Sequence, residues 1–170
     1  MTDMRTREVA SVFEKGCLNP KRSMRQAIDV FRAAEVSHRE PYTRGSSSAR
    51  SKFSADIMIG QVVSKPAKGD RTWDTRLLSC RLKRVGTFAK SAHAEAIASL
   101  ARQGFKPSSP QDALTQKSSG RYEGVYRLEG QTFDVLVYDQ VARNPRVRQV
   151  GNVRYIRGNS YTILKISETK

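Results

Sequence analysis

Residues 140–167 read QVARNPRVRQVGNVRYIRGNSYTILKIS, and this stretch decides our interpretation of the fold. Runs rich in Val, Ile and Tyr surround the dipeptide Gly158-Asn159, which is typical of a tight β-hairpin. We therefore predict two antiparallel strands in which Arg157 pairs with Ser160. Because side chains alternate between the faces of a strand, one face of this hairpin is mostly apolar, and we expect it to be buried.

The outer face of the predicted hairpin combines cations, an amide and an aromatic ring. The same register places Arg154 beside Ile163 and Asn152 beside Lys165, with Tyr161 on the same surface. Arg and Lys can neutralise phosphates while a Tyr ring stacks on a base, as in sheets that bind single-stranded nucleic acid. The candidate binding residues of this region are Arg143, Arg146, Arg148, Asn152, Arg154, Tyr161 and Lys165. The alternative is a solvated face whose charges only maintain solubility.

The charge of the whole chain favours the binding interpretation. The sequence has 31 Lys and Arg against 16 Asp and Glu, a formal net charge of +15. Repulsion among so many positive charges destabilises a compact fold. We therefore expect the protein to bind a polyanionic partner. We expect that partner to be nucleic acid, with RNA or single-stranded DNA before duplex DNA. Self-association into a homo-oligomer stays open.

The sequence carries no signal for membrane insertion or export. It contains neither an apolar run of membrane-spanning length nor the charged and apolar regions of a signal peptide. We therefore expect an intracellular protein, cytoplasmic or nucleoid-associated, that does not bind a membrane. Cys17 and Cys80 form no C-x-x-C pair, so we expect neither a disulfide framework nor a zinc site. We predict no cofactor, no metal-binding residues and no catalytic residues.

The N-terminal part is predicted to be helical. Residues 2–15 have one apolar stripe and are followed by Gly16, which is typical of a helix end. Ser23 and Gln26 have the spacing of a capping box and predict a second helix that extends to about residue 36. Residues 37–52 lack apolar periodicity and predict a flexible basic arm or linker. Two of its cations, Arg44 and Arg50, are further candidates for phosphate contacts.

The remainder alternates between strands and one helix. Residues 53–63 and 73–85 have the two-residue period of strands, and the second carries Arg81 and Lys83 on one face, as additional binding candidates. Small residues form a stripe over residues 86–102, which predicts an Ala-rich helix lying close to a sheet. Residues 121–128 and 131–141 predict a hairpin.

Together these elements predict an α+β protein. It should have a mainly antiparallel sheet of about six strands, an Ala-rich covering helix and two N-terminal helices. We expect a helical pair in residues 1–36, the basic arm in 37–52 and an α+β domain in 53–170.

Three other functions remain open on the sequence. The chain could be a structural or scaffold component of a nucleoprotein or virion assembly, or an inhibitor that binds an acidic host protein. It could also be a metal-independent ribonuclease that uses His38 and His93 as general acid and base. Asp134 and Asp139 are five residues apart on one strand and therefore face opposite sides, which argues against a shared metal ion.

Overall fold

The computed structural model describes residues 4–38, 58–65, 76–143, 146–151, 153–157 and 160–169. The main sheet has eight strands in the order β1-β2-β3-β10-β7-β6-β4, with β5 also paired to β6. Its strands are β1 Ser37–His38, β2 Met58–Lys65, β3 Arg76–Val85, β4 Lys106–Pro107, β5 Thr115–Ser118, β6 Arg121–Leu128, β7 Gln131–Gln140 and β10 Tyr161–Glu168. All strand pairs are antiparallel except β1 with β2. A separate sheet consists of β8 Arg146–Val150 and β9 Val153–Arg157.

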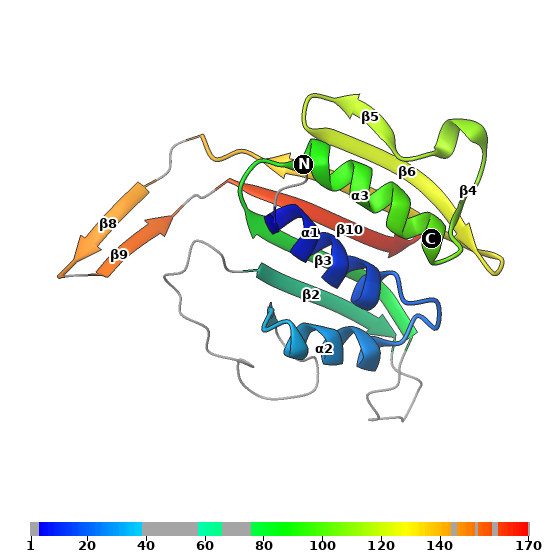
Figure 1. Ribbon diagram of the computed structural model, residues 1–170, viewed down its shortest axis with the longest axis horizontal. Coiled ribbons are helices and arrows are strands. Elements are labelled where there is room, and N and C mark those ends of the chain that lie inside the picture. Colours follow the sequence, from blue (N-terminus) through cyan, green and yellow to red (C-terminus); the bar gives the residue numbers. More distant parts are fainter. Residues whose placement is uncertain are drawn as a thin grey trace.

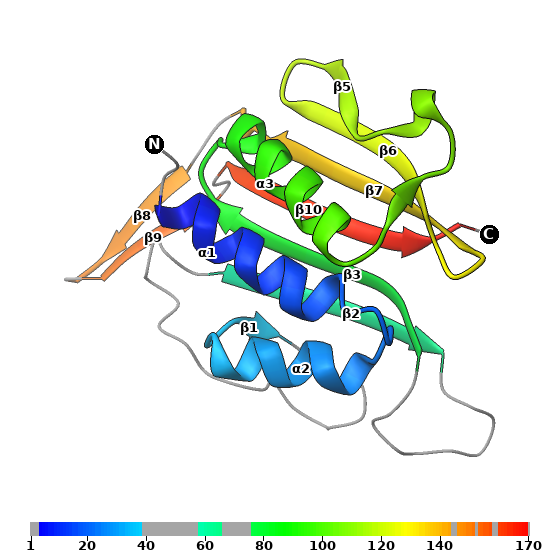
Figure 2. The ribbon, with the colours of Figure 1, turned by 45° about the vertical axis from the view of Figure 1, so that its right-hand side comes forward.

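The helices cover one face of the main sheet. They are α1 Met4–Val12, which continues into the π-helical turn η1 Phe13–Cys17, α2 Met24–Ala33 and α3 Ala89–Arg102, besides the 3₁₀ turn η2 Pro110–Asp112. Figures 1 and 2 show α1, α2 and α3 on the same side of the strands. The predicted α+β class, with an antiparallel sheet, an Ala-rich helix and two N-terminal helices, is confirmed.

One row of buried residues marks the side that the helices cover. Gly60, Leu82, Leu164, Val137 and Tyr122 are paired across five neighbouring strands, and all five are buried. A Cβ on Gly60 would lie only 2.6 Å from the Phe31 ring of α2. The missing side chain thus lets α2 pack directly on β2.

The ends of the helices show how local sequence fixes them. The Ser23 Oγ accepts a hydrogen bond from Gln26 N at 3.2 Å, as expected for the start of α2. The other half of the predicted capping box is wrong, because Ser23 N donates to Asn19 Oδ1 at 2.8 Å, and the Gln26 side chain donates to Lys15 O. The helix also ends at Ala33, earlier than predicted. At α3, Ala89 N donates to Asp139 Oδ1 at 3.1 Å, so the sheet itself caps this helix.

The hairpin β6–β7 follows the prediction. Tyr122 pairs with Val137 and Tyr126 with Phe133, and all four side chains are buried. The turn residues Glu129 and Gly130 have φ values of 50° and 81°. Two left-handed residues in succession are what a tight turn between twisted strands requires.

The predicted C-terminal hairpin is wrong. Strand β9 pairs with β8, with Gly151 of the intervening segment at φ 62°, whereas β10 pairs with β3 and β7. The stretch contains two Gly-Asn dipeptides, and Gly151, between the paired residues Val150 and Val153, belongs to the first of them. Asn152 itself and Gly158-Asn159 lie outside the described residues. Strand β10 also suits a central position, because Ile163 and Leu164, on opposite faces, are both buried.

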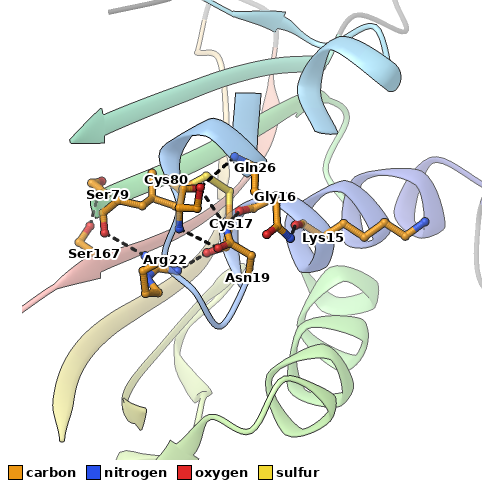
Figure 3. The surroundings of a disulfide bond; sticks show 11 residues. Lys15, Gly16, Cys17, Asn19, Arg22, Gln26, Ser79, Cys80 and Ser167 are labelled. Carbon is orange, nitrogen blue, oxygen red and sulfur yellow. Dashed lines mark hydrogen bonds between the residues drawn. A yellow bond between two sulfur atoms is a disulfide. The ribbon is translucent and has the colours of Figure 1, made fainter. Parts of the chain in front are cut away.

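A disulfide bond joins the helical layer to the sheet, contrary to the prediction. Cys17 at the end of η1 is bonded to Cys80 of β3, with their Cα atoms 5.3 Å apart and both residues fully buried. Figure 3 shows Arg22 beside this bond. Its guanidinium donates to Cys17 O and to Leu77 O and lies 4.8 Å from the centre of the Phe133 ring.

Candidate nucleic-acid interface

The face of the main sheet that is turned away from the described helices carries the candidate site, and we call it the open face. Its residues alternate along each strand with the buried row described above. On β3 and β10, Lys83 pairs with Ile163 and Arg81 pairs with Lys165. On the other side of β10, Ile163 pairs with Tyr138 of β7. The strand register therefore brings cations and an aromatic residue together on one surface.

Three cations of this face lie close together, and we call Arg81, Lys83 and Lys165 the sheet cations. Arg81 and Lys165 are direct cross-strand partners, an arrangement of like charges that destabilises a sheet. Partial burial, and secondly the charge of Arg81, lower the pKa of Lys83. Among the residues that the structure describes, no carboxylate forms an ion pair with a sheet cation. The three side chains therefore concentrate positive charge on this part of the open face.

Acidic groups lie toward the β6 side of the open face. Glu123 of β6 forms an ion pair with Arg121 at 3.1 Å, and Asp134 of β7 is exposed. Asp134 pairs with Ser167 of β10, and Ser167 pairs in turn with Ser79 of β3. The hydroxyl oxygens of the two serines are 3.2 Å apart. The open face therefore has a positive half on β3 and β10 and a mixed half on β7 and β6.

Two half-buried tyrosines share the open face. Tyr161 lies at the start of β10, with the Lys83 Nζ 4.4 Å from the centre of its ring. Tyr138 lies on β7, with the Arg121 guanidinium 5.3 Å from its ring centre. Tyr138 was not among the predicted residues. Its position could have been predicted, because Tyr138 follows Val137, which is buried under the helices. Neighbouring residues of a strand point to opposite faces, so Tyr138 lies on the open face.

The structure brings together four of the predicted binding residues: Arg81, Lys83, Tyr161 and Lys165. Three of the others, Arg146, Arg148 and Arg154, belong to a separate sheet. Arg146 pairs with Arg157, and Arg154 pairs with Gln149, in the β8–β9 hairpin that projects beyond the main sheet in Figure 1. Arg148 lies in the same hairpin, opposite Tyr155. The predicted proximity of Arg154 to Ile163 is therefore wrong, since Lys83 occupies the position beside Ile163.

Three predicted residues, Arg44, Arg50 and Asn152, lie outside the described residues. Arg143 is exposed in the segment between β7 and β8.

The two histidines do not form a common site. His93 Nε2 lies 2.6 Å from Leu114 O, and its ring stacks on Tyr122 of β6 with 4.0 Å between the ring centres. His38 belongs to β1, which is separated from β6 by β2, β3, β10 and β7. At about 4.8 Å per strand, the two strands are roughly 24 Å apart. His38 and His93 therefore belong to elements that lie far apart in the fold.

A second group of cations lies on the helix-covered side, beside α2. A pocket of about 640 Å³ is lined by Lys21, Arg22, Ser23, Arg25, Gln26, Asp29 and Arg76. Arg76 is engaged by Glu168 at 3.2 Å, and the Arg22 guanidinium is held by backbone carbonyls. Lys21 and Arg25 are exposed, which makes them suitable controls for charge effects.

Metal sites and membrane spans are absent from the described ranges. These ranges contain no group of three or more His, Cys, Asp or Glu residues that could hold a metal ion. Nor does any helix within them have the length and apolarity needed to span a membrane. Comparison of the chain with models of known protein families, with curated proteins and with solved structures found no match.

Proposed function

We propose that the protein binds nucleic acid, RNA or single-stranded DNA before duplex DNA, through the open face of its main sheet. One observation carries the proposal: Arg81, Lys83 and Lys165 lie together on β3 and β10, with no ion pair to any described carboxylate. Phosphates would neutralise these charges and release the counterions that otherwise accompany both partners.

The direct pairing of Arg81 with Lys165 supports a role in binding. Like charges opposite each other cost stability unless an anion lies between them. A phosphate group can accept hydrogen bonds from both side chains, and such charge-assisted bonds are stronger than neutral ones. A phosphate bound between Arg81 and Lys165 would therefore offset the repulsion between these two side chains.

The β8–β9 hairpin would extend this interface. Figure 1 shows that it projects beyond the end of the main sheet at which Tyr161 begins β10. Its backbone carries Arg146, Arg148 and Arg154. A nucleic-acid strand that leaves the open face at this end would meet the hairpin.

The proposal is tested by binding of labelled oligonucleotides over a salt series. We expect the double substitution Arg81→Gln and Lys165→Gln to weaken binding to single-stranded RNA and DNA. It should also reduce the slope of log K against log salt by about 0.7 for each phosphate that the variant no longer neutralises. The matched control, Lys21→Gln with Arg25→Gln, removes the same charge on the other side of the sheet.

The control identifies the interface. If both double variants lose affinity equally, binding depends on total charge and the open face is not the site. If the native protein binds none of the nucleic acids near physiological salt, the proposed function is wrong, and an acidic protein becomes the partner to seek.

A further inference from the structure

Both tyrosines of the open face have a cation beside the ring. Lys83 Nζ lies 4.4 Å from the Tyr161 ring centre, and the Arg121 guanidinium lies 5.3 Å from that of Tyr138. Each cation comes from the strand next to that of its tyrosine, β3 beside β10 and β6 beside β7. The two tyrosine strands are themselves neighbours, so the four side chains form one continuous band across the open face.

The strand register fixes the spacing of the two rings. Tyr161 pairs with Gln140, and Tyr138 lies two residues before Gln140 on the same strand. The tyrosines are therefore diagonal neighbours, for which Cα separations are about 7–8 Å. Ile163, which pairs with Tyr138, is only 1% exposed and provides an apolar floor beside the two rings.

We propose that Tyr161 and Tyr138 stack two unpaired bases of a nucleic-acid strand, and that Lys83 and Arg121 leave the rings to contact the flanking phosphates. This inference rests on the proposed function and specifies its ligand. Bases in a duplex already stack on each other, whereas single-stranded nucleic acid can offer them to aromatic side chains on a sheet.

The exchange of ring partners is physically reasonable. A cation beside a half-buried ring gains a weak attraction, since water still solvates the charge. Arg121 also forms an ion pair with Glu123 at 3.1 Å, but the two side chains are 42% and 43% exposed, so this pair contributes little and can be exchanged for a phosphate. A base covers more of the ring than an ammonium or guanidinium group does, and the released cation gains a charge-assisted hydrogen bond to phosphate. Lys83 is suited to this movement because partial burial, and secondly the nearby charge of Arg81, lower its pKa, and an anion beside its ammonium group would offset both effects.

The test separates base stacking from phosphate binding. A single-stranded oligonucleotide and an abasic sugar-phosphate strand of equal length are compared for Tyr161→Leu, Tyr138→Leu and the double variant. We expect each substitution to weaken binding of the base-bearing strand about tenfold, in the range found for removal of a stacking ring. Binding of the abasic strand and the salt slope should not change.

Two further variants provide controls. Phe88→Leu alters another ring beside a cation, with the Arg5 guanidinium 5.8 Å from its centre, but this ring lies at the start of α3. It should leave the affinity unchanged. Lys83→Met should reduce the salt slope by about 0.7, because it removes a phosphate contact and leaves the stacking ring in place.

A fluorescent base analogue gives a measurement that does not require a leucine variant to fold. 2-Aminopurine at two adjacent positions of the oligonucleotide should lose fluorescence on binding to the native protein, and Tyr161→Phe should preserve this loss. Unchanged fluorescence, or equal affinity of the native protein for the abasic and base-bearing strands, would overturn the stacking site while leaving phosphate binding intact. Failure to bind either strand would instead overturn the proposed function.

Discussion

Gly124 of β6 is a residue at which one added methyl group would disturb the packing. A Cβ there would lie 2.8 Å from both Asp112 O and Leu114 N, and these backbone atoms cannot rotate away. We expect Gly124→Ala to lower the free energy of unfolding by about 1–3 kcal/mol, the usual cost of overpacking. Denaturant unfolding followed by circular dichroism would measure it. Thr115→Ala, at an exposed position of the adjacent β5, should cost less than about 0.5 kcal/mol. Equal stability of Gly124→Ala and the native protein would show that the segment before β5 shifts freely.

Two buried arginines show that the net charge overstates the basic surface. Arg22 is 6% exposed and Arg84 is 4% exposed, and Arg84 forms an ion pair with Glu8. Burial lowers the pKa of Arg22 to about 10, opposed by the charge of Glu168, so this side chain stays cationic near neutral pH. Residue counts cannot distinguish such core cations from the sheet cations, because the difference depends on tertiary packing.

Between the elements η1 and α3, Glu14 forms a hydrogen-bonded pair with Arg102. The carboxylate accepts from Arg102 Nη2 at 2.6 Å and from Gln103 Nε2 at 2.9 Å. The bond from Arg102 is the main cause that lowers the pKa of Glu14 from 4.5 to about 2, with burial acting in the opposite direction. Because the folded pKa is the lower one, Glu14 stabilises the fold fully above about pH 4.5, and this contribution is lost as the pH falls toward 2.

The variant Glu14→Gln tests this pH dependence. We expect it to lower the thermal midpoint at pH 6 and to differ progressively less from the native protein between pH 4.5 and 2. Asp134→Asn, which removes an exposed carboxylate from β7, serves as the charge control. A difference between Glu14→Gln and the native protein that stays constant over this range would contradict the role assigned to the charged pair.

At the level of elements, local sequence signals were sufficient to predict single helices and strand pairs that are adjacent in the sequence. The α3 stripe and the β6–β7 register follow from periodicity and from the turn at Glu129 and Gly130. The β10 partners could not be predicted in the same way, since β3 lies far from it along the chain. A Gly-Asn turn signal occurs twice in residues 140–167, and the local sequence does not show which strands pair on either side of it.

The candidate site was therefore predicted in part. Alternation within β3 placed Arg81 and Lys83 on one face, and this needs no knowledge of neighbouring strands. That the same face continues onto β10 with Tyr161 and Lys165 depends on a long-range pairing. We predicted that residues of β9 would lie beside β10, whereas residues of β3 and β7 lie there. The surface is still basic and aromatic, but some of its residues differ from those predicted.

For the whole molecule, the bond between Cys17 and Cys80 is the covalent link between the helical layer and the sheet. Disulfides persist in oxidising compartments and are rare in the cytosol, so the bond argues against the cytoplasmic location expected from the sequence. A sequence separation of 63 residues closes a long loop, for which loss of the bond costs roughly 4 kcal/mol by the chain-entropy relation.

We expect dithiothreitol to lower the denaturant midpoint of the native protein markedly, once partial unfolding exposes the buried bond to the reagent. The double variant Cys17→Ala and Cys80→Ala should have a low midpoint with or without the reagent, because it lacks the bond from the start. Mass spectrometry of the alkylated protein would count the free thiols in parallel. Two alkylated cysteines in the untreated native protein, with no response to dithiothreitol, would show that the fold does not depend on the bond and would remove the argument for an oxidising compartment.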